Sequence, residues 1–223
     1  MSTSASSVPL CPAPWRLSGT GYILLCKFPP EFVRAHGGLS AELQDAFKGG
    51  LGTVMVVDYA QSDVGPYQEL LFIPGRFSLA GQGCFHVPRI YVSSQASIVN
   101  GRRNWAIPKE QADLQFTRAG RHESVTFSRN GVHGGQLRIK TLPIKLPVTT
   151  ALLPAGLRTL IQPSPEGLLK TVISAHGQAQ AVKVEEIGFA ADFFPPVEKQ
   201  HVLLAVKVPV FHMTFPVAEN LGS

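Results

Sequence analysis

The stretch Gly65-Pro66-Tyr67-Gln68-Glu69-Leu70-Leu71-Phe72-Ile73-Pro74-Gly75 decides the fold class, because it is typical of a β-strand with two apolar faces. Successive side chains of a strand point to opposite faces of the sheet. Both rows of this strand are mostly apolar, so we expect it to be covered on both sides. The first row holds Tyr67, Glu69, Leu71 and Ile73, and the second holds Gln68, Leu70 and Phe72.

Glu69 is the charged residue in an otherwise apolar row. Burial of a lone carboxylate is costly unless the group is paired, hydrogen-bonded or protonated. Two interpretations are open. Glu69 either pairs with a nearby arginine or lies at a solvated mouth, or it is placed in a pocket for acid–base work or ligand orientation.

The rest of the chain is divided into short segments by 18 Pro and 21 Gly residues, which is the pattern of a β-rich fold. The dipeptide Asn130-Gly131 predicts a hairpin turn, since both residues tolerate positive φ. Segments rich in β-branched and aromatic residues predict the strands. These are Gly21–Phe28, Thr53–Tyr59, Tyr67–Ile73, Phe85–Val92, Asp113–Phe116, Ser124–Ser128, Gln136–Thr141, Thr171–Ser174, Gln178–Ile187 and His201–Pro209.

Helices are expected to be few and short. Strands outnumber them and do not alternate strictly with them, so we predict a mainly β (α+β) fold and not a doubly wound parallel sheet. The length of 223 residues fits one domain over 14–223, preceded by a disordered arm over 1–13. The expected helices are Pro30–Ala35, Leu39–Phe47 with Ser40 as its cap, Ser94 (as N-cap) to about Asn104, and Leu152–Leu160.

Composition excludes several classes of function. Charged residues make up 16% of the chain and hydrophobic ones 44%, so a sizeable core or pocket is expected. The net charge of +5 is scattered, which argues against nucleic-acid binding. The three cysteines form no CxxC pair, and the histidines show no metal-ligand spacing, so we expect no metal. Common cofactor fingerprints are absent, so we expect no cofactor. With neither a signal peptide nor a membrane-spanning run, the chain is expected to be cytoplasmic.

Lys109 follows a capped helix and a proline. Pro108 constrains the backbone, and Trp105 and Ile107 make the surroundings apolar. A lysine is a nucleophile only as the neutral amine, and moving its pKa from about 10.4 to about 7 corresponds to about 4–5 kcal/mol. An apolar pocket or a neighbouring cation supplies such a shift. The alternative is an ordinary surface lysine at the start of a strand.

Three stretches of the sequence resemble the acetoacetate decarboxylase-like superfamily, and the resemblance covers most of the chain. The most specific stretch is Gly101-Arg102…Ile107-Pro108-Lys109, which is similar to a family segment whose first lysine forms a Schiff base with the β-keto acid. The others are Tyr67-Gln68-Glu69, which matches the context of the family's pocket glutamate, and Pro14-Trp15…Gly19…Gly21-Tyr22 near the start.

The resemblance implies a cone-shaped antiparallel β barrel with a few short helices, a pocket inside the cone, and a homo-oligomer. It also implies that Lys109 and Glu69 are catalytic and that the partner is a small-molecule substrate. Two departures stand out: Glu110 replaces the family's second lysine, and Thr20 stands where a pocket arginine is expected. A carboxylate beside Lys109 favours the ammonium form unless it points away. The residues expected to bind substrate are Tyr67, Arg102, Trp105, Glu110 and Thr20.

Two functions remain open at this point. The first is a lyase that uses the Lys109 Schiff base on a ketone or keto acid, for decarboxylation or aldol-type C–C chemistry. The second is a non-catalytic or accessory protein whose apolar pocket binds a hydrophobic, isoprenoid-like molecule. The second possibility draws on the segment Gln61–Leu70, which resembles a stretch in plant relatives linked to neoxanthin formation.

Overall fold

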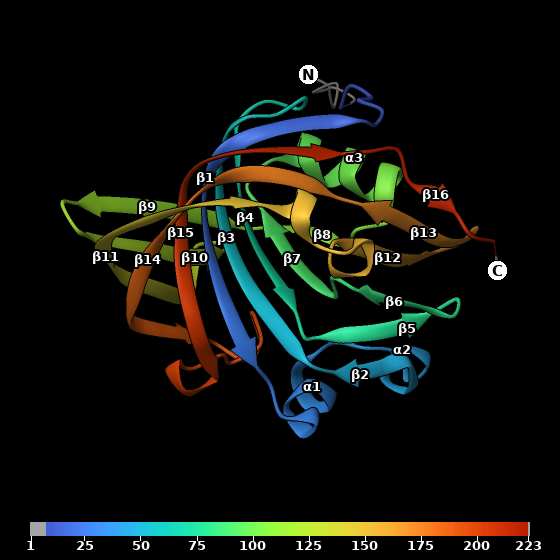
Figure 1. Cartoon of the computed structure of the whole chain (residues 1–223), viewed down its shortest axis with the longest axis horizontal. Coiled ribbons are helices and arrows are strands. Elements are labelled where there is room, and N and C mark those ends of the chain that lie inside the picture. Colours follow the sequence, from blue (N-terminus) through green and yellow to red (C-terminus); the bar gives the residue numbers. More distant parts are fainter. Residues whose placement is uncertain (1–7, 223) are drawn as a thin grey trace, which may run out of the picture.

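The computed structural model describes residues 8–222, which form two β-sheets with a few short helices. Figure 1 shows the larger sheet curling into a nearly closed barrel. Its two outer strands are consecutive in sequence and are joined by the single residue Ala112, whose N–H donates to the carbonyl oxygen of Val92. The mainly β, barrel-like fold predicted from the sequence is thus confirmed.

Ten strands make up the larger sheet. Neighbours pair antiparallel except for the two at one edge, β7 and β8, which run parallel. In spatial order they are β8 (Lys109–Gln111), β7 (Arg89–Val92), β4 (Tyr67–Ile73), β3 (Leu51–Gln61), β1 (Trp15–Lys27), β15 (Val202–Phe215), β14 (Ser174–Phe189), β11 (Val132–Thr149), β10 (His122–Arg129) and β9 (Asp113–Ala119).

The smaller sheet has six short strands and includes one parallel pair, β12 with β6. In spatial order they are β16 (Glu219–Asn220), β13 (Gly167–Val172), β12 (Thr159–Ser164), β6 (Gln82–Phe85), β5 (Arg76–Leu79) and β2 (Phe47–Gly49).

The α-helices found in the described residues are short. No helix within residues 8–222 has the length and apolar character needed to cross a membrane. Ser40 and Ser94 cap two of them as predicted, each accepting a hydrogen bond from a backbone N–H three residues on. The helices are α1 (Pro30–His36), α2 (Ala41–Ala46) and α3 (Gln95–Trp105), with 3-10 turns η1 (Thr150–Leu152), η2 (Ala155–Leu157) and η3 (Lys199–His201).

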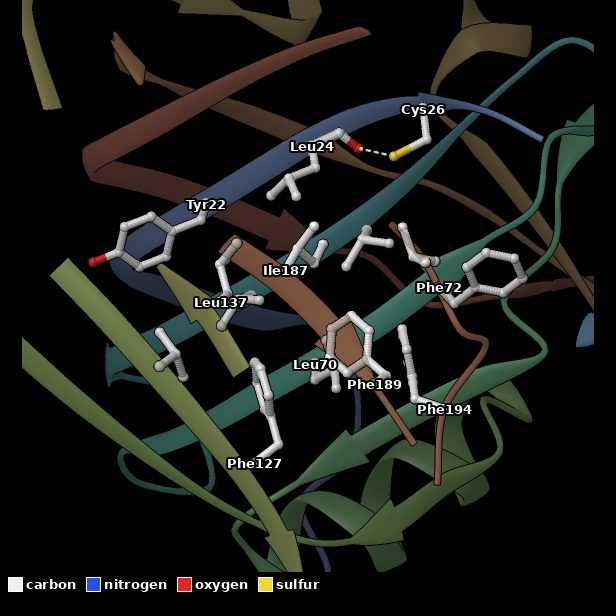
Figure 2. Packing of buried hydrophobic residues seen from close by; sticks show 14 of the residues in the cluster. Tyr22, Leu24, Cys26, Leu70, Phe72, Phe127, Leu137, Ile187, Phe189 and Phe194 are labelled. Atoms are coloured by element: carbon white, nitrogen blue, oxygen red, sulfur yellow. Dashed lines mark hydrogen bonds between the residues drawn. The ribbon is translucent and has the colours of Figure 1, made fainter. Parts of the chain in front are cut away.

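Strand β4 has two buried faces, as its sequence predicts. Leu70 and Phe72 face a cluster that we call the inner core. Figure 2 shows them in one cluster with Phe127 of β10 and Leu137 of β11. The inner core is filled by side chains, and removing one of its fully buried aromatic rings is expected to cost about 3–5 kcal/mol. The opposite face of β4 carries Glu69.

Some predicted elements differ in extent or type. The predicted strand Phe85–Val92 is two strands, β6 and β7, because Pro88 and its neighbours interrupt the pairing. The helix predicted over Leu152–Leu160 is wrong: it is two 3-10 turns followed by strand β12, since Pro154 removes a backbone donor. The Asn130-Gly131 turn is confirmed, with φ of 52° and 77°.

The disordered arm expected over 1–13 is described only in part, because residues 1–7 lie outside the described residues. Residues 8–13 run along α3. The Cys11 N–H donates to Asn100 Oδ1 at 2.7 Å, and the Asn100 amide donates to the Pro9 carbonyl oxygen at 3.0 Å. This segment is therefore held to the helix by paired polar groups.

Candidate functional site

A cavity of about 670 Å³ lies on the face of β4 opposite the inner core. Strands β1, β3, β4, β14 and β15 form its wall, together with the end of α3 and the segment 147–153. Most of the lining side chains are aliphatic or aromatic, and they include Trp15, Trp105 and Phe211. Within residues 8–222, no group of three or more His, Cys, Asp or Glu side chains could hold a metal ion.

Strand register brings Lys109 to the wall of this cavity. Leu71 of β4 lies opposite Ile90 of β7, and Ile90 lies opposite Lys109 of β8. Residues directly opposite each other share a face of the sheet. Leu71, Ile90 and Lys109 thus form one row, and Glu69 stands two residues from Leu71 on the same face.

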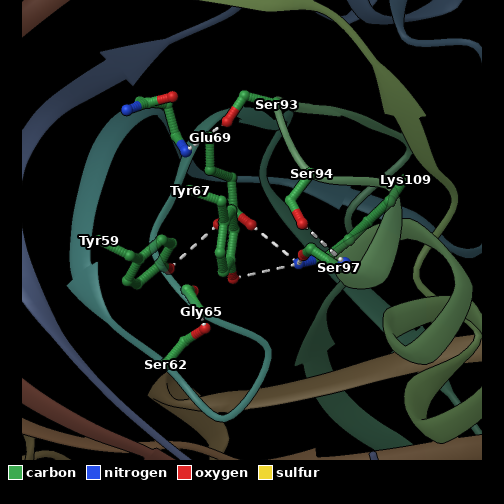
Figure 3. A network of polar contacts seen from close by, with 10 residues as sticks. Tyr59, Ser62, Gly65, Tyr67, Glu69, Ser93, Ser94, Ser97 and Lys109 are labelled. Atoms are coloured by element: carbon green, nitrogen blue, oxygen red, sulfur yellow. Dashed lines mark hydrogen bonds and ion pairs between the residues drawn. The ribbon is translucent and has the colours of Figure 1, made fainter. Parts of the chain in front are cut away.

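The amine of Lys109 and the carboxylate of Glu69 form a buried ion pair. Lys109 Nζ lies 2.9 Å from Glu69 Oε2, and each residue is 4% exposed. The ammonium also donates to Ser97 Oγ at 3.0 Å and more weakly to Tyr67 Oη at 3.4 Å. Tyr59 Oη donates to the second carboxylate oxygen at 3.1 Å. Figure 3 shows these contacts converging on the lysine, so its three N–H hydrogens are all engaged.

Electrostatics keep this lysine charged at rest. Burial alone would lower the pKa of Lys109, but the adjacent Glu69 carboxylate and Tyr67 outweigh it and raise the pKa above 10.5. Burial also raises the pKa of Tyr67 to about 12, so this phenol keeps its proton at neutral pH. The sequence suggested a lysine made neutral by an apolar pocket or a neighbouring cation, whereas its neighbour is an anion.

Helix α3 positions Lys109 through two neighbouring residues. The Arg102 Nε–H donates to the carbonyl oxygen of Lys109 at 2.8 Å and fixes its backbone. Gly101 leaves room for the side chain, because a Cβ atom there would lie 2.8 Å from Lys109 Cδ and 2.9 Å from Cε. The lysine stem therefore crosses the helix where the helix has no side chain.

This contact predicts that Gly101→Ala lowers the free energy of unfolding. In an exposed helix the change stabilises by about 1 kcal/mol. Here the added methyl overlaps the Lys109 stem, and overpacking costs about 1–3 kcal/mol. Urea denaturation measures the difference. Gly188→Ala is the control, since a Cβ atom at Gly188 meets nothing within 4 Å. A Gly101→Ala protein more stable than wild type would contradict the close contact.

The five predicted substrate-binding residues fall into two groups. Tyr67 and Trp105 line the cavity. The structure does not bring the other three to its wall. Thr20 donates to the Pro209 carbonyl oxygen, and Arg102 holds the Lys109 backbone as described.

Glu110 alternates to the face opposite Lys109 and pairs with Arg129 at 2.8 Å. The carboxylate next to Lys109 in sequence therefore points away from the amine. The carboxylate that controls the charge of Lys109 is Glu69.

A second lysine, which is half-buried and also paired with a glutamate, offers an internal comparison. Lys207 donates to Glu123 Oε1 at 2.6 Å, and Tyr22 donates to the other carboxylate oxygen. The residue types match those around Lys109, yet the lining of the 670 Å³ cavity does not include Lys207. This lysine is a matched control for experiments on Lys109.

Sequence reasoning gave no role to Tyr59 and Ser97. Ser97 precedes Gly101 by four residues, so both lie on the helix face that meets Lys109. That spacing is a signal visible in the sequence. Tyr59 reaches Glu69 only because β3 pairs with β4 in the register that sets Tyr59 opposite Tyr67, which the sequence alone did not fix.

Comparison with known proteins gives one family match. A sequence model described as acetoacetate decarboxylase (ADC) matches residues 41–167. None of the curated proteins compared matches the chain.

Solved structures share the fold at low sequence identity. The acetoacetate decarboxylase from Legionella pneumophila subsp. pneumophila str. Philadelphia 1 is 13% identical with a TM-score of 0.68, covering 95% of this chain and 88% of that one. The enduracididine biosynthesis enzyme MppR, complexed with pyruvate, is 16% identical with a TM-score of 0.65, covering 97% and 93%. An acetoacetate decarboxylase-like enzyme from Sphingomonas wittichii RW1 is 14% identical with a TM-score of 0.65, covering 99% and 97%.

Proposed function

Because the chain belongs to the acetoacetate decarboxylase family, we propose that it is an enzyme that forms a Schiff base between Lys109 and the carbonyl group of a small molecule. The iminium then serves decarboxylation or aldol-type C–C chemistry. The observation that carries this proposal is the buried Lys109–Glu69 pair, 2.9 Å apart, at the wall of an apolar cavity.

Glu69 supplies the proton transfers that the reaction needs. The resting ammonium gives one proton to the Glu69 carboxylate, and the neutral amine adds to the carbonyl carbon as the C=O π bond breaks, which leaves an alkoxide. A second proton passes from the nitrogen of the adduct to this oxygen and forms a hydroxyl group. Protonated Glu69 then returns the proton to the departing hydroxyl group, which leaves as water. One ammonium and one ketone thus yield one iminium and one water, and the charge is conserved.

The relatives support carbonyl chemistry in this fold. One structure of MppR holds pyruvate, and another holds the condensation product of pyruvate and imidazole 4-carboxaldehyde. The lining of the cavity also favours a second candidate, a binding protein for a hydrophobic small molecule. The two candidates differ in whether a covalent bond forms at Lys109.

Borohydride trapping tests the proposal. When the chain is incubated with a panel of ketones and keto acids and then with borohydride, we expect one stable adduct per chain by intact mass. Peptide mapping should place it on Lys109. The adduct should disappear in Lys109→Met and persist in Lys207→Met, which removes the half-buried lysine that pairs with Glu123. Labelling that survives Lys109→Met would refute the proposed function.

A further inference from the structure

We propose that the site takes an uncharged, largely apolar ketone or aldehyde and discriminates against keto acids. This inference rests on the proposed Schiff-base function and names its substrate class. It follows from the charges in the cavity, the lining and the entrance.

The first argument is a count of charges. Among the described residues that line the cavity, Lys109 is the only lysine or arginine, and Glu69 already neutralises it. The lining also includes the imidazole of His176, which stacks on His212. Arg158, which precedes β12, is not part of the lining. When the iminium forms, its positive charge remains balanced by Glu69. A carboxylate on the substrate would add an anion for which the lining offers no further lysine or arginine, and a low-dielectric cavity disfavours such an anion.

The second argument is the lining itself. Beyond the polar cluster at Lys109, the wall is built mostly from the aliphatic and aromatic side chains of facing strands, and Thr149, Thr150 and His176 are its other polar side chains. Ile23, Val57 and Val208 are examples from β1, β3 and β15. A volume of about 670 Å³ lies within the ~300–1,000 Å³ range of pockets that enclose drug-sized molecules. The surface complementary to this wall is hydrocarbon.

The third argument is the entrance. Val148, Leu152 and Leu153 line the cavity and are also 41%, 86% and 42% exposed, so they form its outer boundary. Exposed apolar side chains that gather at one place mark a site that meets an apolar partner. An entering hydrocarbon therefore meets apolar side chains at the rim, although Thr149 and Thr150 also line this part of the cavity.

A substrate without a carboxylate changes the reaction that the iminium serves. There is no CO₂ to lose, so the electron sink acts on an α C–H bond. Glu69 accepts the α-proton, and the C–H electron pair forms the C=C bond of an enamine while the iminium nitrogen becomes neutral. The enamine carbon can then take a deuteron from D₂O by the reverse step, or add to an aldehyde.

A matched pair of compounds tests the proposal on the full chain. Nonan-4-one and 4-oxononanoate have the same carbon skeleton and the same ketone, but the second carries a carboxylate in place of a terminal methyl group. With borohydride, we expect nonan-4-one to label Lys109 at least tenfold faster than 4-oxononanoate. In D₂O, nuclear magnetic resonance should show exchange at its α-carbons with wild type and none above background with Lys109→Met.

The outcomes separate this inference from the proposed function. Equal or faster labelling by 4-oxononanoate would overturn the apolar substrate class and leave the Schiff-base function standing. Labelling of Lys109 by neither compound, nor by the wider panel, would overturn both. Labelling by nonan-4-one that is unchanged in Lys109→Met would place the reaction on another lysine and overturn both as well.

Discussion

Replacing Lys109 by Met is expected to lower the free energy of unfolding by about 3–5 kcal/mol, because it leaves the Glu69 carboxylate buried without its cation. Met has a similar stem, so the packing against Gly101 is largely kept. What is lost is the ion pair at 2.9 Å, while the hydrogen bond from Tyr59 to Glu69 remains. The same variant removes the amine that the proposed reaction requires.

A double-mutant cycle with Glu69→Gln separates charge from packing. The amide that this substitution introduces is neutral and can still accept the hydrogen bond from Tyr59. Replacing both members of a buried pair is often close to neutral, so the double variant Lys109→Met/Glu69→Gln should regain most of the loss. Chemical denaturation measures all four proteins. Additive losses in the double variant would contradict the ion pair as the source of the effect.

Glu69→Gln alone is expected to reverse the direction of the Lys109 pKa shift. In the wild-type protein the Glu69 carboxylate is the strongest influence holding the amine in its charged form. Without it, burial dominates, and burial lowers the pKa of a lysine. The amine of the variant should therefore titrate below 10.5 and that of the wild type above it.

Nuclear magnetic resonance of protein labelled with ¹³C-lysine follows this titration at the ε-carbon of Lys109. Glu123→Gln is the matched control, since it removes the buried carboxylate that pairs with Lys207 and should leave the pKa of Lys109 unchanged. If Lys109 titrates at the same pH in Glu69→Gln and wild type, the carboxylate does not set its charge.

The direction of the Lys109 pKa shift in the wild-type protein also determines how the free energy of unfolding depends on pH. The folded-state pKa of Lys109 is raised above its ordinary value of 10.5. The folded chain thus holds this proton more tightly than the unfolded chain does. The stabilisation is fully present below about pH 10 and is lost as the pH rises through the folded-state pKa.

The sequence predicted the fold well where local patterns decide it. The two faces of β4, the caps Ser40 and Ser94 and the Asn130-Gly131 turn depend on neighbours along the chain. The short strands of the smaller sheet were largely missed. Strands of two to six residues carry little periodicity, and their pairing, such as Leu160 with Phe85, is set by distant parts of the chain.

The candidate site was predictable in its residues and not in its charge. Alternation along β4 and the family resemblance pointed to Glu69 and Lys109, which the structure places in contact. The protonation of the lysine depends on which carboxylate reaches it. Glu110 is next to Lys109 in sequence and was therefore the carboxylate expected beside its amine. The alternation of side chains along β8 instead turns Glu110 toward Arg129. The pairing of β7 with β8 places Lys109 on the face that carries Glu69.

The cluster of Tyr22, Glu123 and Lys207 has a consequence for recognising such enzymes. A structural search for a tyrosine and a lysine that both contact one glutamate would find two such clusters among the described residues. Of these two lysine nitrogens, the one at position 109 borders unfilled space large enough for a guest molecule. Lys109 and Lys207 therefore differ in the open volume beside the nitrogen, a feature that a comparison of residue types alone does not capture.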